Sequence, residues 1–214
     1  MSDSSHKPST SSPAQGCAAE AWTQADHAAR RAMIVDTALA LLHEDDLKAV
    51  TMRRVAERLG VGAMTLYTYI DGQHELYREM VRRGFEMLHE NCVASSTLGT
   101  PEGWRGGARA YIQFALTHPN LYKLMFDTPD AEGEGEVDLL RGGFEPLLEK
   151  VREHLAAEGL SGETLNRRAR AAAGRYWIAL HGLATLAIAG RLVVLEGDVD
   201  QILDDMLPRI APTA

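Results

Sequence analysis

The stretch MRRVAERLGVGAMTLYTYI, residues 52–70, carries side chains suited to contact with a polyanion. Within 51–70 the three arginines Arg53, Arg54 and Arg58 outnumber the single acid Glu57 by two. The whole chain has a formal net charge of -8, and residues 91–214 hold 12 basic and 17 acidic residues. A positive segment in an acidic chain is typical of a protein that touches DNA phosphates with one small face.

The apolar residues of this stretch favour two short helices around a turn. Val55, Leu59, Val61, Leu66 and Tyr69 fall at positions 4, 8, 10, 15 and 18 counted from Met52, where they form the small core of a helix-turn-helix. Ala56 allows the two helices to approach closely. Gly60 can adopt the left-handed conformation that reverses the chain, which costs other residues ~1–2 kcal/mol. The sequence therefore predicts a helix-turn-helix over 51–70 rather than a plain helical hairpin.

The remaining segments show helical periodicity and no convincing strand alternation. Thr51, Ser161 and Asp198 are predicted N-caps, and Thr100-Pro101 suits a helix start. The acidic, glycine-rich segment 127–138 is predicted to be a loop or a flexible helix start. Outside 51–70, helices are expected over 25–43, 73–95, 139–158, 161–191 and 199–209, and two more follow Thr100-Pro101, separated by an interruption at 118–120.

These elements predict an all-α chain of about nine helices. We expect a three-helix DNA-binding domain over 24–72 and a larger helical ligand-binding and dimerisation domain over 73–214. Residues 1–23 are rich in Ser, Thr, Pro and Ala and are predicted to be a disordered tail. They lack the apolar core of a signal peptide.

Composition indicates a cytoplasmic protein without a membrane anchor. The longest apolar stretch, 182–190, is far shorter than the ~20 residues that span a bilayer. The two cysteines, Cys17 and Cys92, are too few for a disulfide framework or a zinc site. We expect no metal and no cofactor.

Two regions resemble known regulators. Residues 51–76, TMRRVAERLGVGAMTLYTYIDGQHEL, look like the DNA-binding domain of TetR-family transcriptional regulators, and 30–42 are similar to that family's first helix. Segments 106–126 and 177–182 (WIALHG) resemble the ligand-binding domain of a TetR subgroup marked by a Trp and then His-Gly. The resemblance implies a homodimer that binds double-stranded operator DNA and responds to a small-molecule effector.

The resemblance also implies residue roles. Gly62, Ala63, Met64 and Thr65 match the start of the recognition helix, where Thr65 can bond a base and Ala63 and Met64 can touch thymine methyl groups. Tyr67 and Tyr69 match phosphate-holding tyrosines, with core packing the alternative for Tyr69. The other expected DNA contacts are Thr51, Arg53, Arg54, Gln73 and His74.

Two positions depart from the family pattern. Gly62 stands where many relatives have Ser or Thr, so a capping hydroxyl is missing. Gln73 stands where a lysine is common; it can donate a hydrogen bond but carries no charge, and His74 beside it can compensate only when protonated. Neither departure is expected to abolish DNA binding, although Gln73 keeps open the alternative of a helix-turn-helix that does not bind DNA.

The C-terminal region contains a predicted dimer interface and a predicted pocket. Small side chains crowd 169–191, which suits close helix packing, and TetR relatives dimerise through the matching helices, here about 165–209. Packing within one chain is the alternative. Trp177 and His181 share a helix face. The expected pocket residues, for which core packing is the alternative, are Phe114, Tyr122, Met125, Phe126, Trp177 and His181.

The function predicted is a repressor released from a palindromic operator by a small, largely apolar effector. An enzyme is the second hypothesis, but the sequence contains no HExxH, no GxSxG, no phosphate-binding glycine loop and no Cys/His pairing. The acidic stretches 43–46 (HEDD) and 130–138 are the metal-binding candidates, although such loops are usually only solvated. A helical interaction module whose helix-turn-helix does not bind DNA, and a transcriptional activator, are the further alternatives.

Overall fold

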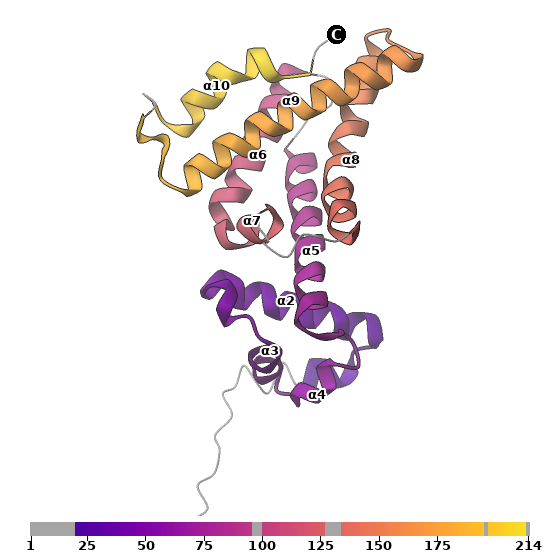
Figure 1. Ribbon diagram of the computed structural model, residues 1–214, viewed down its shortest axis with the longest axis vertical. Coiled ribbons are helices and arrows are strands. Elements are labelled where there is room, and N and C mark those ends of the chain that lie inside the picture. Colours follow the sequence, from indigo (N-terminus) through magenta and orange to yellow (C-terminus); the bar gives the residue numbers. More distant parts are fainter. Residues whose placement is uncertain (1–19, 96–99, 127–133, 195–196, 213–214) are drawn as a thin grey trace, which may run out of the picture. The chain divides into compact units, whose positions relative to one another are not determined.

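The computed structural model describes residues 20–95, 100–126, 134–194 and 197–212. Within these ranges every regular element is a helix, as predicted (Figure 1). The chain divides into two units, Met1–Met80 (unit 1) and Val81–Ala214 (unit 2). Their boundary falls inside one long helix, whereas the sequence suggested a division at its start.

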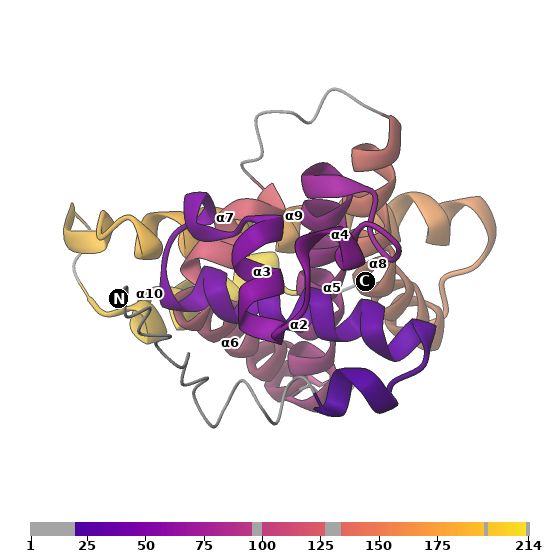
Figure 2. The same cartoon turned by 90° about the horizontal axis from the view of Figure 1, so that it is seen from below.

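Unit 1 is a small helical domain (Figure 2). It contains α2 (His27–Glu44), the 3-10 turn η1 (Leu47–Ala49), α3 (Met52–Leu59), α4 (Ala63–Leu66) and the beginning of α5 (Gly72–Ala94). The predicted cap of α3 is confirmed, because the Thr51 hydroxyl accepts a hydrogen bond from the backbone N–H of Arg54 at 3.2 Å.

The core of unit 1 follows the predicted apolar stripes. On α2, Ile34, Ala38, Leu41 and Leu42 are each at most 2% exposed. Val55, Leu59 and Leu66 of the helix-turn-helix, together with Leu76 and Met80 of α5, complete this core. Their burial removes apolar surface from water, which is the main favourable contribution to folding.

The structure differs from the predicted tail at its C-terminal end. Residues 20–24 are helical, and Trp22 within them is buried. The Trp22 ring meets the Tyr69 ring edge-on at 5.3 Å, and its carbonyl accepts a hydrogen bond from Arg30 Nε at 3.0 Å. One aromatic side chain thus anchors a segment whose composition is otherwise that of a tail; residues 1–19 lie outside the described residues.

Unit 2 consists of longer helices. After the end of α5 come α6 (Pro101–Thr117), α7 (Pro119–Phe126), α8 (Glu134–Ala157), α9 (Gly162–Ile188), the 3-10 turn η2 (Leu192–Val194) and α10 (Val199–Ile210). α9 packs against α6, α8 and α10. Buried alanines on α9, Ala169, Ala172, Ala173 and Ala184, allow this close packing.

The helix ends of unit 2 follow the predicted caps with two differences. Thr100 accepts from the N–H of Gly103 at 3.0 Å, and Asp198 forms a capping box with Gln201. Ser161 is the N-cap of α9, but its side chain makes no capping bond. α8 begins at 134 rather than 139, so residues 134–138 form a helix start, one of the two predictions for 127–138; residues 127–133 lie outside the described residues. No helix of the described part is long and apolar enough to cross a membrane.

Candidate DNA-binding surface and internal cavity

The turn between α3 and α4 has the predicted geometry. Gly60 adopts φ 72° and ψ 28°, the left-handed region, and its N–H bonds back to the carbonyls of Ala56 and Glu57. The N–H of Val61 bonds to the carbonyl of Ala56 at 3.0 Å. Since a residue with a Cβ is strained in this conformation, glycine at 60 sets the angle between the helices.

The recognition segment is shorter than a regular helix. α4 has four residues, Gly62 caps it without a side-chain bond, and hydrogen-bonded turns continue the chain through Ile70. Leu66 is fully buried and holds the segment to the core. Met64 is 79% exposed and Tyr67 is 50% exposed, so two large apolar side chains face outward from a segment of only a few residues.

The arginines of α3 are not free cations. Arg53 Nε lies 2.8 Å from Glu57, Arg54 Nη2 lies 2.9 Å from Asp45, and Arg58 Nη1 lies 2.9 Å from Glu44. The hydrogen bond from Arg58 lowers the pKa of the Glu44 carboxyl. Residues 20–80 as a whole hold seven basic and ten acidic residues. The positive charge expected at this surface is therefore largely neutralised within the unit.

The same ion pairs involve the segment HEDD, residues 43–46, which the sequence suggested as a possible metal-binding site. Glu44 and Asp45 are ion-pair partners of arginines, and the Asp46 carboxylate accepts from the N–H of Ala49 at 3.1 Å. Among the described residues there is no cluster of His, Cys, Asp and Glu arranged to hold a metal ion. These carboxylates instead position arginines and cap a turn.

Gln73 and Tyr69, both expected at phosphates, have partners inside the unit. The Gln73 amide donates to the carbonyl of Val50 at 2.6 Å and accepts from the N–H of Met52 at 3.3 Å, so it holds the start of α3. The Tyr69 hydroxyl accepts from Arg30 Nη1 at 2.9 Å. For Tyr69 these contacts favour the alternative of core packing. His74 is exposed.

Arg31 connects three segments of unit 1, a role that the sequence did not suggest. Its guanidinium donates to the Tyr69 carbonyl and to the Glu75 and Glu79 carboxylates, the last at 2.7 Å. Glu79 is 8% exposed. The bonds to Glu75 and Glu79 raise the pKa of Arg31, while the Asp71 backbone N–H and then Arg31 lower the pKa of Glu75. This network fixes the end of the recognition segment against α2 and α5.

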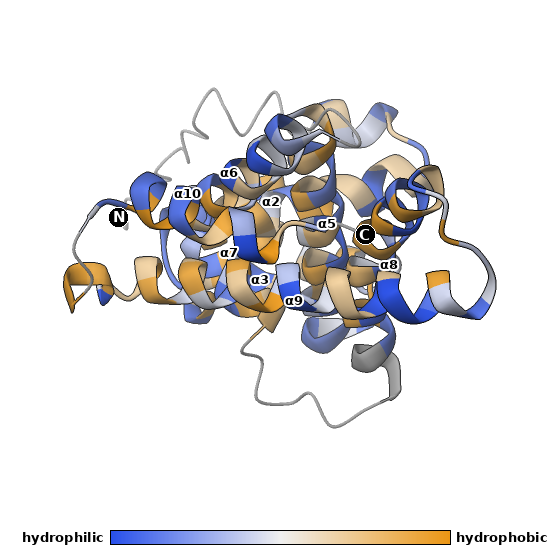
Figure 3. Cartoon of the chain, turned by 90° about the horizontal axis from the view of Figure 1, so that it is seen from above, coloured by the Kyte–Doolittle hydropathy of each residue, from blue (hydrophilic) through white to orange (hydrophobic). Residues whose placement is uncertain are grey.

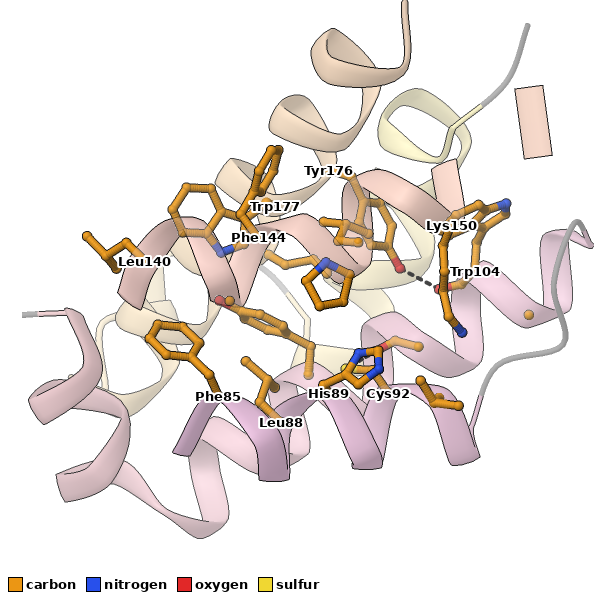
Figure 4. A pocket seen from close by; sticks show the side chains of 18 residues that line it. Phe85, Leu88, His89, Cys92, Trp104, Leu140, Phe144, Lys150, Tyr176 and Trp177 are labelled. Carbon is orange, nitrogen blue, oxygen red and sulfur yellow. Dashed lines mark hydrogen bonds between the residues drawn. The ribbon is translucent and has the colours of Figure 1, made fainter. Parts of the chain in front are cut away.

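Unit 2 encloses a cavity between α5, α6, α8 and α9 (Figure 4). Its empty volume is about 800 Å³, including the part that opens to solvent. Aromatic and aliphatic side chains form most of its wall, which is typical of small-molecule sites. The wall includes Phe85, Cys92, Trp104, Tyr111, Leu140, Phe144, Lys150, Tyr176 and Trp177.

Of the predicted pocket residues, only Trp177 lines this cavity. Phe114, Tyr122 and Met125 are at most 3% exposed, and with Phe126 and His181 they pack beside it. Tyr122 shares hydrogen bonds with Tyr111 Oη at 2.9 Å and with His181 Nδ1 at 2.8 Å. These five residues form the packed neighbourhood of the cavity, which was the alternative considered for them.

The residues that line the cavity could not have been identified from helical periodicity. An apolar stripe that lines a cavity has the same period as one that fills a core. Gly143 is an example: a Cβ there would lie 2.3 Å from the Phe85 ring, so glycine lets α8 approach α5 at the wall.

The thiol and phenol groups of the wall are neutral. Burial raises the pKa of the Cys92 thiol to about 12 and raises the pKa of Tyr111 and Tyr176 above their usual range. The Tyr176 hydroxyl donates to the Trp104 carbonyl at 2.6 Å. Cys92, Tyr111 and Tyr176 are therefore present as a protonated thiol and two protonated phenols.

Comparison with known proteins agrees with this arrangement. A model of the tetracycline repressor-like C-terminal domain matches residues 104–210, half of the chain, and a model of bacterial regulatory proteins of the tetR family matches residues 34–80. The chain is 27% identical over 186 residues to the uncharacterized HTH-type transcriptional regulator Rv0681 of Mycobacterium tuberculosis, covering 85% of this chain and 79% of that protein. It is 33% identical over 123 residues to the HTH-type transcriptional repressor DrrR1 of Streptomyces coeruleorubidus, covering 56% of this chain and 42% of that one.

Solved structures share the fold. A tetR-family transcriptional regulator from Streptomyces coelicolor superposes with a TM-score of 0.66 at 17% identity, covering 84% of this chain and 78% of that one. ActR of the same organism, solved in complex with (S)-DNPA, gives 0.55 at 20% identity, covering 84% and 94%. Because family models match both the helix-turn-helix unit and half of the chain at its C-terminal side, this protein belongs to the TetR family of DNA-binding transcriptional regulators.

Proposed function

We propose that the protein is a cytoplasmic repressor that binds a palindromic operator as a homodimer and is released by a small, largely apolar effector. One observation supports the assignment of DNA contacts to particular residues. Met64 and Tyr67 are exposed, although Leu66 in the same short segment is fully buried. Exposed apolar side chains at this place suit contact with thymine methyl groups and the DNA backbone. Thr51, Arg53, Arg54, Gly62, Ala63 and Thr65 complete the proposed contact surface.

A gel-shift assay with the DNA that flanks the protein's own gene tests the proposal. A dimer with twofold symmetry reads two half-sites about one helical turn, ~34 Å, apart, so footprinting should show an inverted repeat. Absence of a specific complex would favour the interaction-module alternative, and a complex that raises transcription of a reporter would favour the activator.

Variants at Tyr67 and Thr65 separate backbone contact from base reading. Tyr67→Ala should weaken binding to operator and to unrelated DNA alike, because phosphate contacts carry no sequence information. Thr65→Ala should reduce the preference for operator by ~1–3 kcal/mol, the value of a good base contact. Titration of both DNAs against each variant measures the two effects, with Tyr67→Phe as the control that removes only the hydroxyl. Equal loss of preference in both alanine variants would show that the assigned roles are wrong.

The dimer interface is proposed on the outward side of α9. Ile178 is 68% exposed, Leu186 is 43% exposed, and Gly182 lies between them at the same helical spacing, so an apolar stripe is uncovered in the single chain. The hydropathy colours of Figure 3 show hydrophobic residues along α9. Such a stripe suits burial against a second copy. Packing within the chain, the alternative, accounts for the buried alanines of α9 but not for this side.

Gly182→Arg should produce a folded monomer. A Cβ at 182 meets no atom within 4 Å in the single chain, so the substitution leaves the fold of unit 2 intact while placing a bulky charge in the proposed interface. Sedimentation should show half the mass of the wild-type particle, with unchanged helical circular dichroism. Gly142→Arg is the matched control, since its Cβ also meets nothing and it lies on α8. A Gly182→Arg protein that remains dimeric would place the interface elsewhere.

A further inference from the structure

The cavity of unit 2 has an apolar end and a polar end. Along α8 the wall runs from Leu140 through Phe144 to Lys150, a distance of ~15 Å at the rise of an α-helix. The Phe144 ring lies 5.6 Å from the Trp177 ring. Figure 4 shows Leu140, Phe144 and Trp177 toward one side and Lys150 with Trp104 toward the other.

Trp104 and Lys150 belong to the same end. The Trp104 ring lies 5.7 Å from the ring of His154, which is one helical turn after Lys150 on α8. Lys150 also acts on Cys92, where its charge opposes the effect of burial on the thiol. At this end the Tyr176 hydroxyl is already bonded to the Trp104 carbonyl.

The Trp104 indole contributes an unused donor. Its Nε1 is buried and has no hydrogen-bond partner in the described part of the chain, and the residue is 9% exposed. A buried donor without a partner costs ~1–3 kcal/mol, so an acceptor placed there by a ligand recovers that free energy. The other indole of the wall, Trp177, lowers the pKa of the Tyr111 hydroxyl against the larger effect of burial and so acts on that group.

The ionisable side chains of the wall that can carry charge near neutral pH are basic. None of the 18 side chains that line the cavity is acidic, whereas Lys150 and His89 are basic. This contrasts with residues 81–214 as a whole, which hold 14 basic and 19 acidic residues. An apolar body with an anionic head therefore matches the cavity better than a neutral or cationic molecule does.

We propose that the effector is an aromatic organic acid, with its ring system among Phe85, Phe144 and Trp177 and its carboxylate at Lys150 and Trp104 Nε1. The assignment rests on the proposed function, because it names the class of ligand for the same cavity. The aromatic wall selects a flat body, and the cation and the indole N–H select the head group.

Calorimetric titration of the full-length protein tests whether the cavity prefers an anionic head group. The three probes share a naphthalene ring and differ in the charge of the head group. The probes are 2-naphthylacetate, the neutral 2-naphthylacetamide and the cationic 2-(2-naphthyl)ethylamine. The acid should bind roughly tenfold or more tightly than the amide, as expected for hydrogen bonds to a charged group, and the amine should bind most weakly. Acid and amide binding equally, or tighter binding of the amine, would overturn the proposal.

Variants of the cavity wall test which side chains produce the preference for the acid over the amide. Lys150→Met and Trp104→Phe should each reduce the acid-to-amide ratio, Lys150→Met bringing it close to one, while Lys150→Arg should keep most of it. Lys123→Met is the control, because Lys123 is exposed on α7 and does not line the cavity. A ratio that survives Lys150→Met would also overturn the proposal, and melting curves without ligand confirm that each variant is folded.

Measuring whether each probe releases the protein from operator DNA distinguishes a failure of the effector inference from a failure of the proposed repressor function. If acid and amide both bind and both release operator DNA equally, the repressor assignment stands and the head-group inference fails. If none of the three probes binds but the gel-shift assay shows a DNA complex, the cavity does not bind aromatic organic acids. The inference about the effector then fails, whereas the proposal of DNA binding stands. Release by the acid alone supports both.

Discussion

Arg31→Met should lower the free energy of unfolding of unit 1 by about 3 kcal/mol, the low end of the range for breaking a buried ion pair, because Arg31 is itself partly exposed. The loss arises mainly from Glu79, whose buried carboxylate loses the hydrogen bond from Arg31. It also releases the Tyr69 carbonyl at the end of the recognition segment. Since small domains have only ~5–15 kcal/mol of stability, DNA binding should fall as well.

Hydrogen exchange of the α3 amides measures this effect in the full-length protein, because it reports the opening of unit 1 alone. Arg53→Met is the control: it also removes an arginine ion pair, but an exposed one, and should leave exchange nearly unchanged. Adding Glu79→Gln to Arg31→Met should restore part of the protection, because the buried charge is gone. If the double variant exchanges as fast as the single one, the buried carboxylate is not the cause.

The combined variant Glu44→Gln/Asp45→Asn should bind non-specific DNA more tightly and with a steeper dependence on salt. These two acids hold Arg58 and Arg54, and the pairs are exposed, so breaking them alters stability little. Without these acids, Arg54 and Arg58 meet phosphate with their charge no longer neutralised, which is equivalent to about two further phosphate contacts and increases the salt slope by ~1.8. Between ~50 and ~200 mM salt, that slope corresponds to a further tenfold or so loss of affinity.

Fluorescence anisotropy with unrelated duplex DNA over a salt series measures this slope. The matched control is Glu20→Gln/Asp36→Asn, which removes two exposed acids of the same unit that hold no arginine in the ion pairs seen here. An effect of net charge alone would appear equally in the control. If neither variant changes the slope, Arg54 and Arg58 do not meet phosphate, and the acidic residues serve only the fold of unit 1.

The local parts of this protein could be predicted from its residues. Apolar periodicity placed the helices, the Thr51, Thr100 and Asp198 side chains marked where three of them begin, and Gly60 marked the turn. Each depends on contacts within a few residues, for which spacing along the chain is a sufficient guide. The same local pattern carried the resemblance to the TetR family, which the family models confirm.

Contacts between distant segments were decided only by the tertiary structure. Arg31 meets acids 44 and 48 residues away, and Arg58 meets Glu44 across a turn, so a count of charges in 51–70 overestimated the positive surface. Gln73 reaches back to Val50 in the same way. Long side chains pair according to where the backbone folds, which their own spacing does not specify.

The cavity shows the same division between sequence and structure. Of the residues that the sequence indicated, Trp177 lines the cavity, whereas Phe114, Tyr122 and Met125 are buried beside it. A cavity exists where facing stripes fail to fill the space between helices, and that depends on helix separation and on the volumes of side chains from four elements together. Periodicity predicts which side of a helix faces inward; only the assembled helices decide whether that side meets other atoms or empty space.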